Sequence, residues 1–178
     1  MASVIMKQFN APGELHRTGL GQYSVSHTDR WDTITTIYSR PDAPVRAALE
    51  MRLTGGSDAL LAAQRGNTST LSIEVFTILT TPPDDWRTFR QQVVDHWTSY
   101  NSPSTGEYIN ARPHWAKQWW DLKVRGKPIE EYLKDDVYKV AFAEFREVME
   151  GIITKRGGTV EEARSRFGND LLERLIWN

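Results

Sequence analysis

Two side chains of opposite charge, Glu50 and Arg52, stand two residues apart in a segment that alternates apolar and polar residues. On a β-strand, residues at this spacing point to the same side of the sheet, roughly 6–7 Å apart along the chain. A carboxylate and a guanidinium held side by side can orient a polar substrate. They can equally form a solvated ion pair, and exposed pairs of that kind add little stability. The pattern alone leaves both interpretations open.

A second carboxylate, Glu74, lies in the middle of another alternating segment, residues 71–79. If this segment pairs with the first, Glu74 shares a sheet face with Glu50 and Arg52. A face that carries these groups is either solvated surface or the floor of a polar pocket.

The densest group of chemically capable residues runs from Arg112 to Trp120. His114 and Lys117 are three residues apart and lie together if the chain turns helically after Pro113. The tryptophans of this segment are Trp115, Trp119 and Trp120. Indole rings beside cations would make a wall for a flat, electron-rich ligand. The alternative is aromatic packing, with the basic groups reaching past the rings to water.

The elements that must position these residues are strands early in the chain and helices late. Alternation and β-branched residues predict strands at 33–38, 45–53 and 71–79, and a short one at 108–112. The first thirty residues show little periodicity and read as an irregular arm.

Apolar residues at spacings of three and four predict a helix over 86–97, with Asp84 or Asp85 as its cap, and a longer helix over 137–152. Pro128 suits the first turn of a short helix, and Thr159 with Glu162 forms a capping box that opens another. This order predicts an α+β fold, in which helices cover one face of an antiparallel sheet. We expect residues 1–40 to form an N-terminal arm and first strand, and residues 41–178 the rest of a single domain.

Composition excludes several classes of function. The chain has 178 residues and a net charge of -1, so it lacks the basic excess of a dedicated nucleic-acid binder. Without cysteine it has no disulfide, no thiolate metal site and no cysteine nucleophile, and we expect no metal site. With no signal peptide and no long apolar run, we expect an intracellular, cytoplasmic protein without a membrane span.

Four segments, at 49–52, 62–67, 70–77 and 112–117, occur in an order that resembles the substrate-binding cap domain of vanillyl-alcohol-oxidase-type FAD-dependent oxidases. The closest branches are the sugar-1,4-lactone and alditol oxidases and the covalent-flavin cholesterol oxidases. The resemblance runs from Pro44 to the C-terminus, and its most specific element is the His-Trp-x-Lys motif at 114–117. The resemblance implies that 41–178 is a cap-like substrate domain.

The resemblance also implies roles for single residues. Lys117 would face the flavin ring as a cation that stabilises the reduced form, with His114 and Trp115 lining the same place. Glu50 and Arg52 would orient the hydroxyl-bearing carbon of a substrate, whose hydride passes to the flavin. Further substrate contacts would come from Glu74, Trp119, Trp120 and Arg112. The sugar-oxidising branches place a histidine where Glu74 aligns, which favours the sterol-like branches or related oxidoreductases of undefined substrate.

The family's flavin-binding domain, with its glycine-rich phosphate loop, has no counterpart in this sequence. We therefore expect FAD to bind only with a flavin-binding domain supplied in cis or in trans, and not tightly to this chain alone. The alternatives are a stand-alone cap that binds an apolar small molecule or performs non-redox chemistry on it, and an interaction module. Self-association into a homo-oligomer also stays open.

Overall fold

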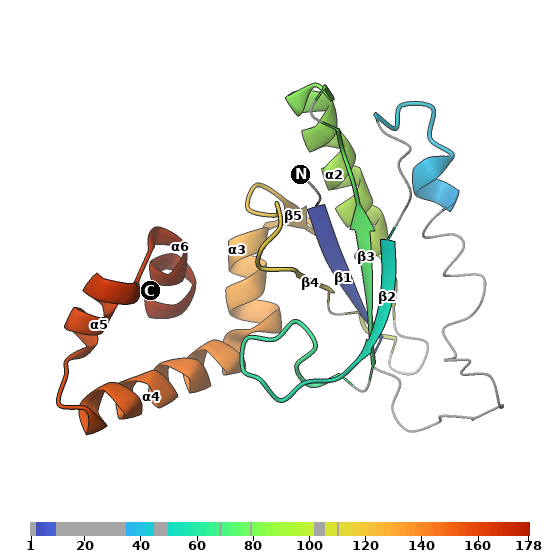
Figure 1. Cartoon of the computed structure of the whole chain (residues 1–178). Coiled ribbons are helices and arrows are strands. Elements are labelled where there is room, and N and C mark those ends of the chain that lie inside the picture. Colours follow the sequence, from blue (N-terminus) through green and yellow to red (C-terminus); the bar gives the residue numbers. More distant parts are fainter. Residues whose placement is uncertain are drawn as a thin grey trace.

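The computed structural model of the chain describes residues 3–9, 35–44, 50–67, 69–78, 80–101, 106–109 and 111–178. Strands early in the chain form a four-stranded sheet, and helices dominate the second half (Figure 1). The predicted α+β class with an antiparallel sheet is confirmed. Among the described residues, no helix has both the length and the apolar character that crossing a bilayer requires.

The main sheet has the strand order β2-β3-β1-β4. Its strands are β1 (Ser3–Phe9), β2 (Glu50–Gly55), β3 (Ser69–Val75) and β4 (Ala111–Pro113). The irregular arm predicted at the N-terminus differs from this, because β1 lies inside the sheet and pairs with both β3 and β4. Strand β1 therefore lies between β3 and β4, which overlap the strands predicted at 71–79 and 108–112.

The strand predicted at 33–38 is wrong over its described part, because residues 35–38 are helical. The amide of Ser39 donates to the carbonyl oxygen of Thr35, which closes a helical turn, and Ile37 is buried in the core. Strand propensity depends on packing context more than helix propensity does, and here burial of one apolar side chain decides the outcome. Of the strand predicted at 45–53, residues 45–49 lie outside the described residues.

Helix α2 (Pro83–Trp97) covers the apolar face of the sheet. The predicted stripe is confirmed, since the helix buries Trp86, Phe89, Val93 and Trp97 against the core that includes the inward side chains of β3. The predicted aspartate cap is wrong: Pro82 occupies the cap position without a side-chain hydrogen bond, and the acidic residues lie in the first turn. They still favour the helix there, because negative charge complements the helix N-terminus.

A short hairpin lies next to α2. It consists of β5 (Lys123–Val124) and β6 (Lys127–Pro128). Its two turn residues, Arg125 and Gly126, both have positive φ, at 51° and 80°. Two positive φ values are what a two-residue turn of type I′ requires between twisted strands.

The remaining helices lead away from the sheet (Figure 1). They are α3 (Ile129–Tyr132), the π-helical turn η1 (Leu133–Val137), α4 (Lys139–Lys155), α5 (Val160–Phe167), α6 (Asp170–Leu172) and a second π-helical turn, η2 (Glu173–Trp177). The capping box at the start of α5 is confirmed, because Thr159 and Glu162 satisfy each other's backbone amides. Helix α4 projects from the body of the chain, and α5 and α6 fold back at its far end (Figure 1).

Candidate functional site

One face of the sheet carries the polar residues that the sequence analysis singled out. In the register of β2 and β3, Glu50 is opposite Glu74 and Arg52 is opposite Ser72. Residues opposite each other on paired strands, and residues two apart on one strand, lie on the same face, so the register places Arg52 and Glu74 on one face, as predicted. Arg52 is exposed there, whereas the side chain of Glu50 lies outside the described part of the chain.

Glu74 and Lys117 form the ion pair at the centre of this face. The ammonium nitrogen of Lys117 lies 2.7 Å from Oε1 of Glu74, and the two side chains are 33% and 12% exposed. A carboxylate this well buried needs a partner for its charge, and the ammonium group supplies it. The pair also fixes where the Lys117 charge sits, because both side chains lose most of their freedom to move.

A turn after β4 brings Lys117 to Glu74. The strand ends at Pro113, and the amide of Lys117 then donates to the carbonyl oxygen of His114 at 3.0 Å. This bond closes a β-turn over residues 114–117, so the chain turns after Pro113 as predicted, although the segment does not form a helix.

His114 is exposed, and its hydrogen bond indicates which ring nitrogen carries the proton in the neutral ring. Its Nδ1 accepts from the amide of Ala116 at 3.2 Å. A ring nitrogen that accepts carries no proton, so the proton of the neutral ring lies on Nε2. His114 therefore offers an N–H donor to solvent or to a ligand.

The three tryptophans of the segment do not form one wall. Trp119 is 1% exposed and belongs to the core, whereas Trp120 is 59% exposed. Trp115 is half-buried, two residues from Lys117, and its indole N–H donates to the carbonyl oxygen of Leu61 at 2.8 Å. Only Trp115 therefore combines an accessible ring with a position next to the ion pair.

Trp115 continues into an aromatic cluster at the start of α4. Its ring centroid lies 5.3 Å from that of Tyr138 and 6.4 Å from that of Phe142, which are themselves stacked at 5.3 Å. The sequence analysis did not single out Tyr138. Its spacing of four residues from Phe142 and seven from Phe145 is a helical aromatic stripe that could have indicated this cluster.

Arg112 is buried among backbone carbonyl groups. Its guanidinium donates to Ala63 at 3.3 Å, to Arg65 at 2.8 Å and to Val137 at 3.1 Å, and it lies 4.7 Å from the ring centroid of Tyr138. Burial lowers the pKa of the guanidinium, which nevertheless stays protonated because arginine starts so high. Arg112 thus fastens the loop before β3 and the turn η1 to the sheet, and it contacts none of the other candidate site residues through these bonds.

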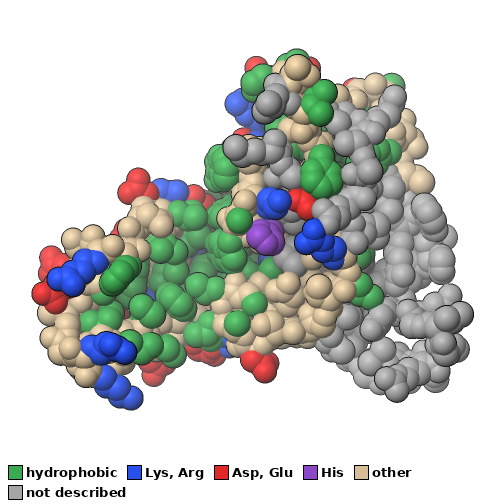
Figure 2. Space-filling model, in the orientation of Figure 1, with side chains coloured by type: hydrophobic (Ala, Val, Ile, Leu, Met, Phe, Trp, Pro, Cys, Tyr) green, Lys and Arg blue, Asp and Glu red, His purple; other side chains and the backbone are tan. Residues whose placement is uncertain are grey.

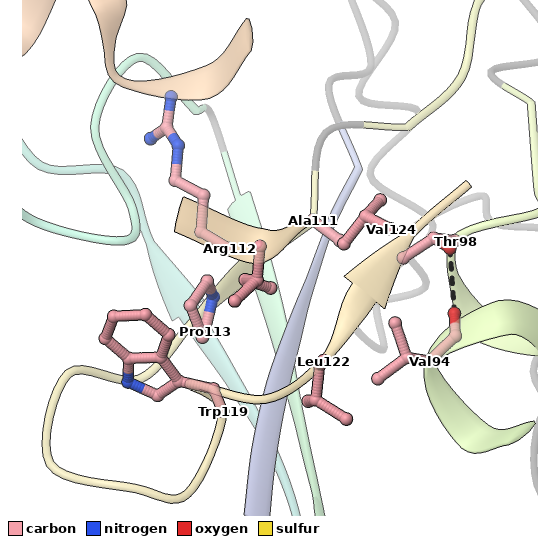
Figure 3. Close-up of a pocket in the computed structure, with 9 residues that line it drawn as sticks. Val94, Thr98, Ala111, Arg112, Pro113, Trp119, Leu122 and Val124 are labelled. Atoms are coloured by element: carbon pink, nitrogen blue, oxygen red, sulfur yellow. Dashed lines mark hydrogen bonds between the residues drawn. The ribbon is translucent and has the colours of Figure 1, made fainter. Parts of the chain in front are cut away.

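A small cavity of about 10 Å³ lies next to strand β4. Its lining is formed by Val94, Thr98, Ala111, Arg112, Pro113, Trp119, Leu122, Val124 and Ile129. The Thr98 hydroxyl already donates to Val94, and the charged end of Arg112 points away from the cavity (Figure 3). A buried water needs two to four polar partners, so we expect this cavity to be empty and regard it as a packing defect.

Within the described ranges, no cluster of three or more histidine, aspartate or glutamate side chains could hold a metal ion. The structure thus brings together Lys117, Glu74, His114 and Trp115 beside the face of Arg52. The ring of Trp119 packs edge-on against that of Trp115, at 5.7 Å between centroids, but is buried in the core, whereas Trp120 is exposed. A comparison with protein-family models, curated proteins and solved structures finds no match to the chain.

Proposed function

We propose that this chain is the substrate-binding cap portion of an FAD-dependent oxidoreductase that oxidises a hydroxyl-bearing substrate. The observation that supports this proposal is the half-buried ion pair of Lys117 and Glu74, on the sheet face of Glu50 and Arg52. Three segments far apart in the sequence contribute to that face. A protein surface with no binding or catalytic role rarely holds a lysine against a carboxylate that is 12% exposed.

Lys117 is the residue proposed to face the flavin. When bound, the flavin ring would accept a hydride from the carbinol carbon of the substrate. The ammonium group would stabilise the negative charge that the ring gains, and a fixed cation does this better than mobile water. Glu74 would hold the ammonium group in place. It would also reduce the net positive charge that the ring experiences.

His114 and the charged pair of β2 would act on the substrate. The Nε2–H of neutral His114 is a donor that faces outward. Glu50 and Arg52, on the same sheet face as Glu74, would orient the hydroxyl group.

The rest of the cofactor would depend on a second domain. Tight binding of a dinucleotide uses a glycine-rich loop at the start of a helix. Gly55 is instead the last residue of β2, and Gly56, which follows it, makes its tight approach to the backbone of Asn67. We therefore expect the flavin ring of FAD to bind weakly to this chain. The phosphate groups of FAD should add nothing to the affinity.

Titration of riboflavin and of FAD, followed by flavin fluorescence, tests this proposal. We expect weak ring binding by the native chain, equal for the two ligands, and at least a tenfold loss in Lys117→Met. Lys139→Met, which removes an exposed lysine at the start of α4, is the matched control. Riboflavin binding that is undetectable up to about 1 mM, or that is unchanged in Lys117→Met, would contradict the proposal.

A second candidate function is a stand-alone cap that binds an apolar small molecule. The observation that favours it is the aromatic cluster of Trp115, Tyr138 and Phe142 beside the ion pair. This reading predicts quenching of tryptophan fluorescence by a sterol, weakened in Trp115→Leu, in a chain that binds no riboflavin.

A further inference from the structure

The C-terminal half of helix α4 carries apolar side chains that the described residues leave about half exposed. Of its seventeen residues only Ala141 and Phe142 are buried. Val148 and Ile152, four residues apart and hence on one side of the helix, are 50% and 48% exposed. Figure 2 shows apolar side chains gathered over this part of the molecule, on the helices that project from the sheet. Exposed apolar surface of this kind marks a contact with another molecule.

Gly151 lies on the same side of α4, between Val148 and Ile152. Glycine destabilises the interior of a helix relative to alanine. A Cβ atom at Gly151 would meet nothing within 4 Å, so neither close packing nor a left-handed backbone accounts for glycine within the described chain. A glycine on an exposed helix face lets another backbone approach closely.

The charges on either side of Gly151 have opposite signs. Glu147 and Glu150 precede it, Lys155 and Arg156 follow it, and all of them are exposed. When two copies of such a helix run antiparallel and cross at Gly151, the residue four before the glycine meets the residue four after it. Glu147 then faces Lys155 of the partner subunit, and two-fold symmetry makes this contact twice. A parallel pair would place like charges together.

We propose that two copies of this chain associate through antiparallel α4 helices that cross at Gly151, with Val148 and Ile152 buried between them. The exposed half of one helix is much smaller than the roughly 800 Å² per partner of a standard interface. We therefore expect a weak dimer, with a dissociation constant on the order of 10 to 100 μM. This inference does not depend on the proposed oxidoreductase function.

Sedimentation equilibrium of the full chain tests the dimer, with concentrations on both sides of that range. We expect the mean mass to rise from 20.4 kDa toward twice that value. E147K and K155E should each weaken association at least tenfold, because each turns two attractive contacts into two repulsive ones. The double variant E147K/K155E should recover the native dissociation constant to within about threefold.

K139E is the matched control, since it reverses an exposed charge at the other end of α4 and should leave association unchanged. Circular dichroism of each variant verifies that the helices are intact. A native chain that stays monomeric, or a dimer that either single variant leaves unchanged, would overturn the proposal. A dimer that the double variant does not recover would overturn the antiparallel arrangement.

Discussion

Helices α2 and α4 have similar lengths but meet the rest of the chain in opposite ways. Helix α2 has 15 residues and buries six of them, whereas α4 has 17 and buries two. Both sequences carry an apolar stripe at helical spacing. The stripe of α2 lies on the sheet. Among the described residues, the stripe of α4 is buried only at Ala141 and Phe142, is partly covered at Phe145, and is about half exposed at Val148 and Ile152. An apolar stripe therefore identifies a helix face that needs cover, and only the tertiary structure shows whether the chain itself provides it.

The candidate site lies where the sheet, which α2 covers, meets the helices that project from it. The ion pair of Lys117 and Glu74 belongs to the sheet, and the ring of Trp115, two residues from Lys117, packs against η1 and α4. Arg112 crosses the same boundary through its bond to Val137. The site therefore depends on how firmly the projecting helices are attached to the sheet, and the following variants measure this.

The largest effect is expected for Trp97→Ala in α2. Trp97 is 0% exposed and lies in the core that joins helix and sheet. Loss of a buried indole removes its transfer free energy and leaves a cavity, so the free energy of unfolding should fall by about 3–5 kcal/mol. Urea denaturation followed by circular dichroism measures the change. A loss below about 1 kcal/mol would show that α2 is no more firmly packed than α4.

Arg112→Met tests the attachment between the two regions. The substitution keeps an unbranched apolar stem but removes the guanidinium group and its three hydrogen bonds to backbone carbonyl groups. We expect the free energy of unfolding to fall by roughly 2–4 kcal/mol. The loop at 57–67 should also become sensitive to trypsin, because two of the lost bonds hold it. Arg156→Met, at an exposed position, should change neither property.

Much of the fold was predictable because it is encoded locally. The stripe of α2 and the capping box of Thr159 and Glu162 each follow from a spacing within a short segment. The turn that follows Pro113 is of the same kind.

The remainder depends on contacts between distant segments. Strand β1 lies between β3 and β4, although no pattern in its sequence indicates which strands it pairs with. The hydrogen bonds of Arg112 go to carbonyl groups, which every residue has, so no side-chain pattern could reveal them. Trp119 and Trp120 are neighbours in the sequence, yet one is buried and the other is exposed. That difference follows from the path of the chain around the core.

A matched pair of substitutions compares the two helices directly. Val93 in α2 is 0% exposed and Val148 in α4 is 50% exposed. Val93→Ala should lower the free energy of unfolding by about 2 kcal/mol, because two buried methyl groups and their contacts are lost. Val148→Ala should change it by less than about 0.5 kcal/mol, since the greater helix propensity of alanine offsets the small loss of burial. Denaturation at low chain concentration, where the monomer dominates, measures both values, and equal losses would contradict the comparison.

An effect that is small at neutral pH concerns Tyr138, which lies between η1 and α4. Burial raises the pKa of its hydroxyl to about 12, although the nearby Arg112 cation opposes the shift. The folded chain therefore retains a proton that the unfolded chain releases near pH 10. This contribution to stability is complete below pH 10 and decreases as the pH rises toward 12, by about 1.4 kcal/mol at pH 11.

Tyr138→Phe isolates that contribution. Within the described chain, the buried Tyr138 hydroxyl has no well-aligned hydrogen-bond partner, because the indole N–H of Trp115 donates to Leu61. The substitution should therefore change stability by less than about 1 kcal/mol at pH 7. Between pH 9 and pH 11 the variant should lose less stability than the native chain, and urea denaturation at each pH measures the difference. If both proteins lose stability equally over this range, Tyr138 is not held in its neutral form, and the cluster that joins α4 to the sheet must be open to water.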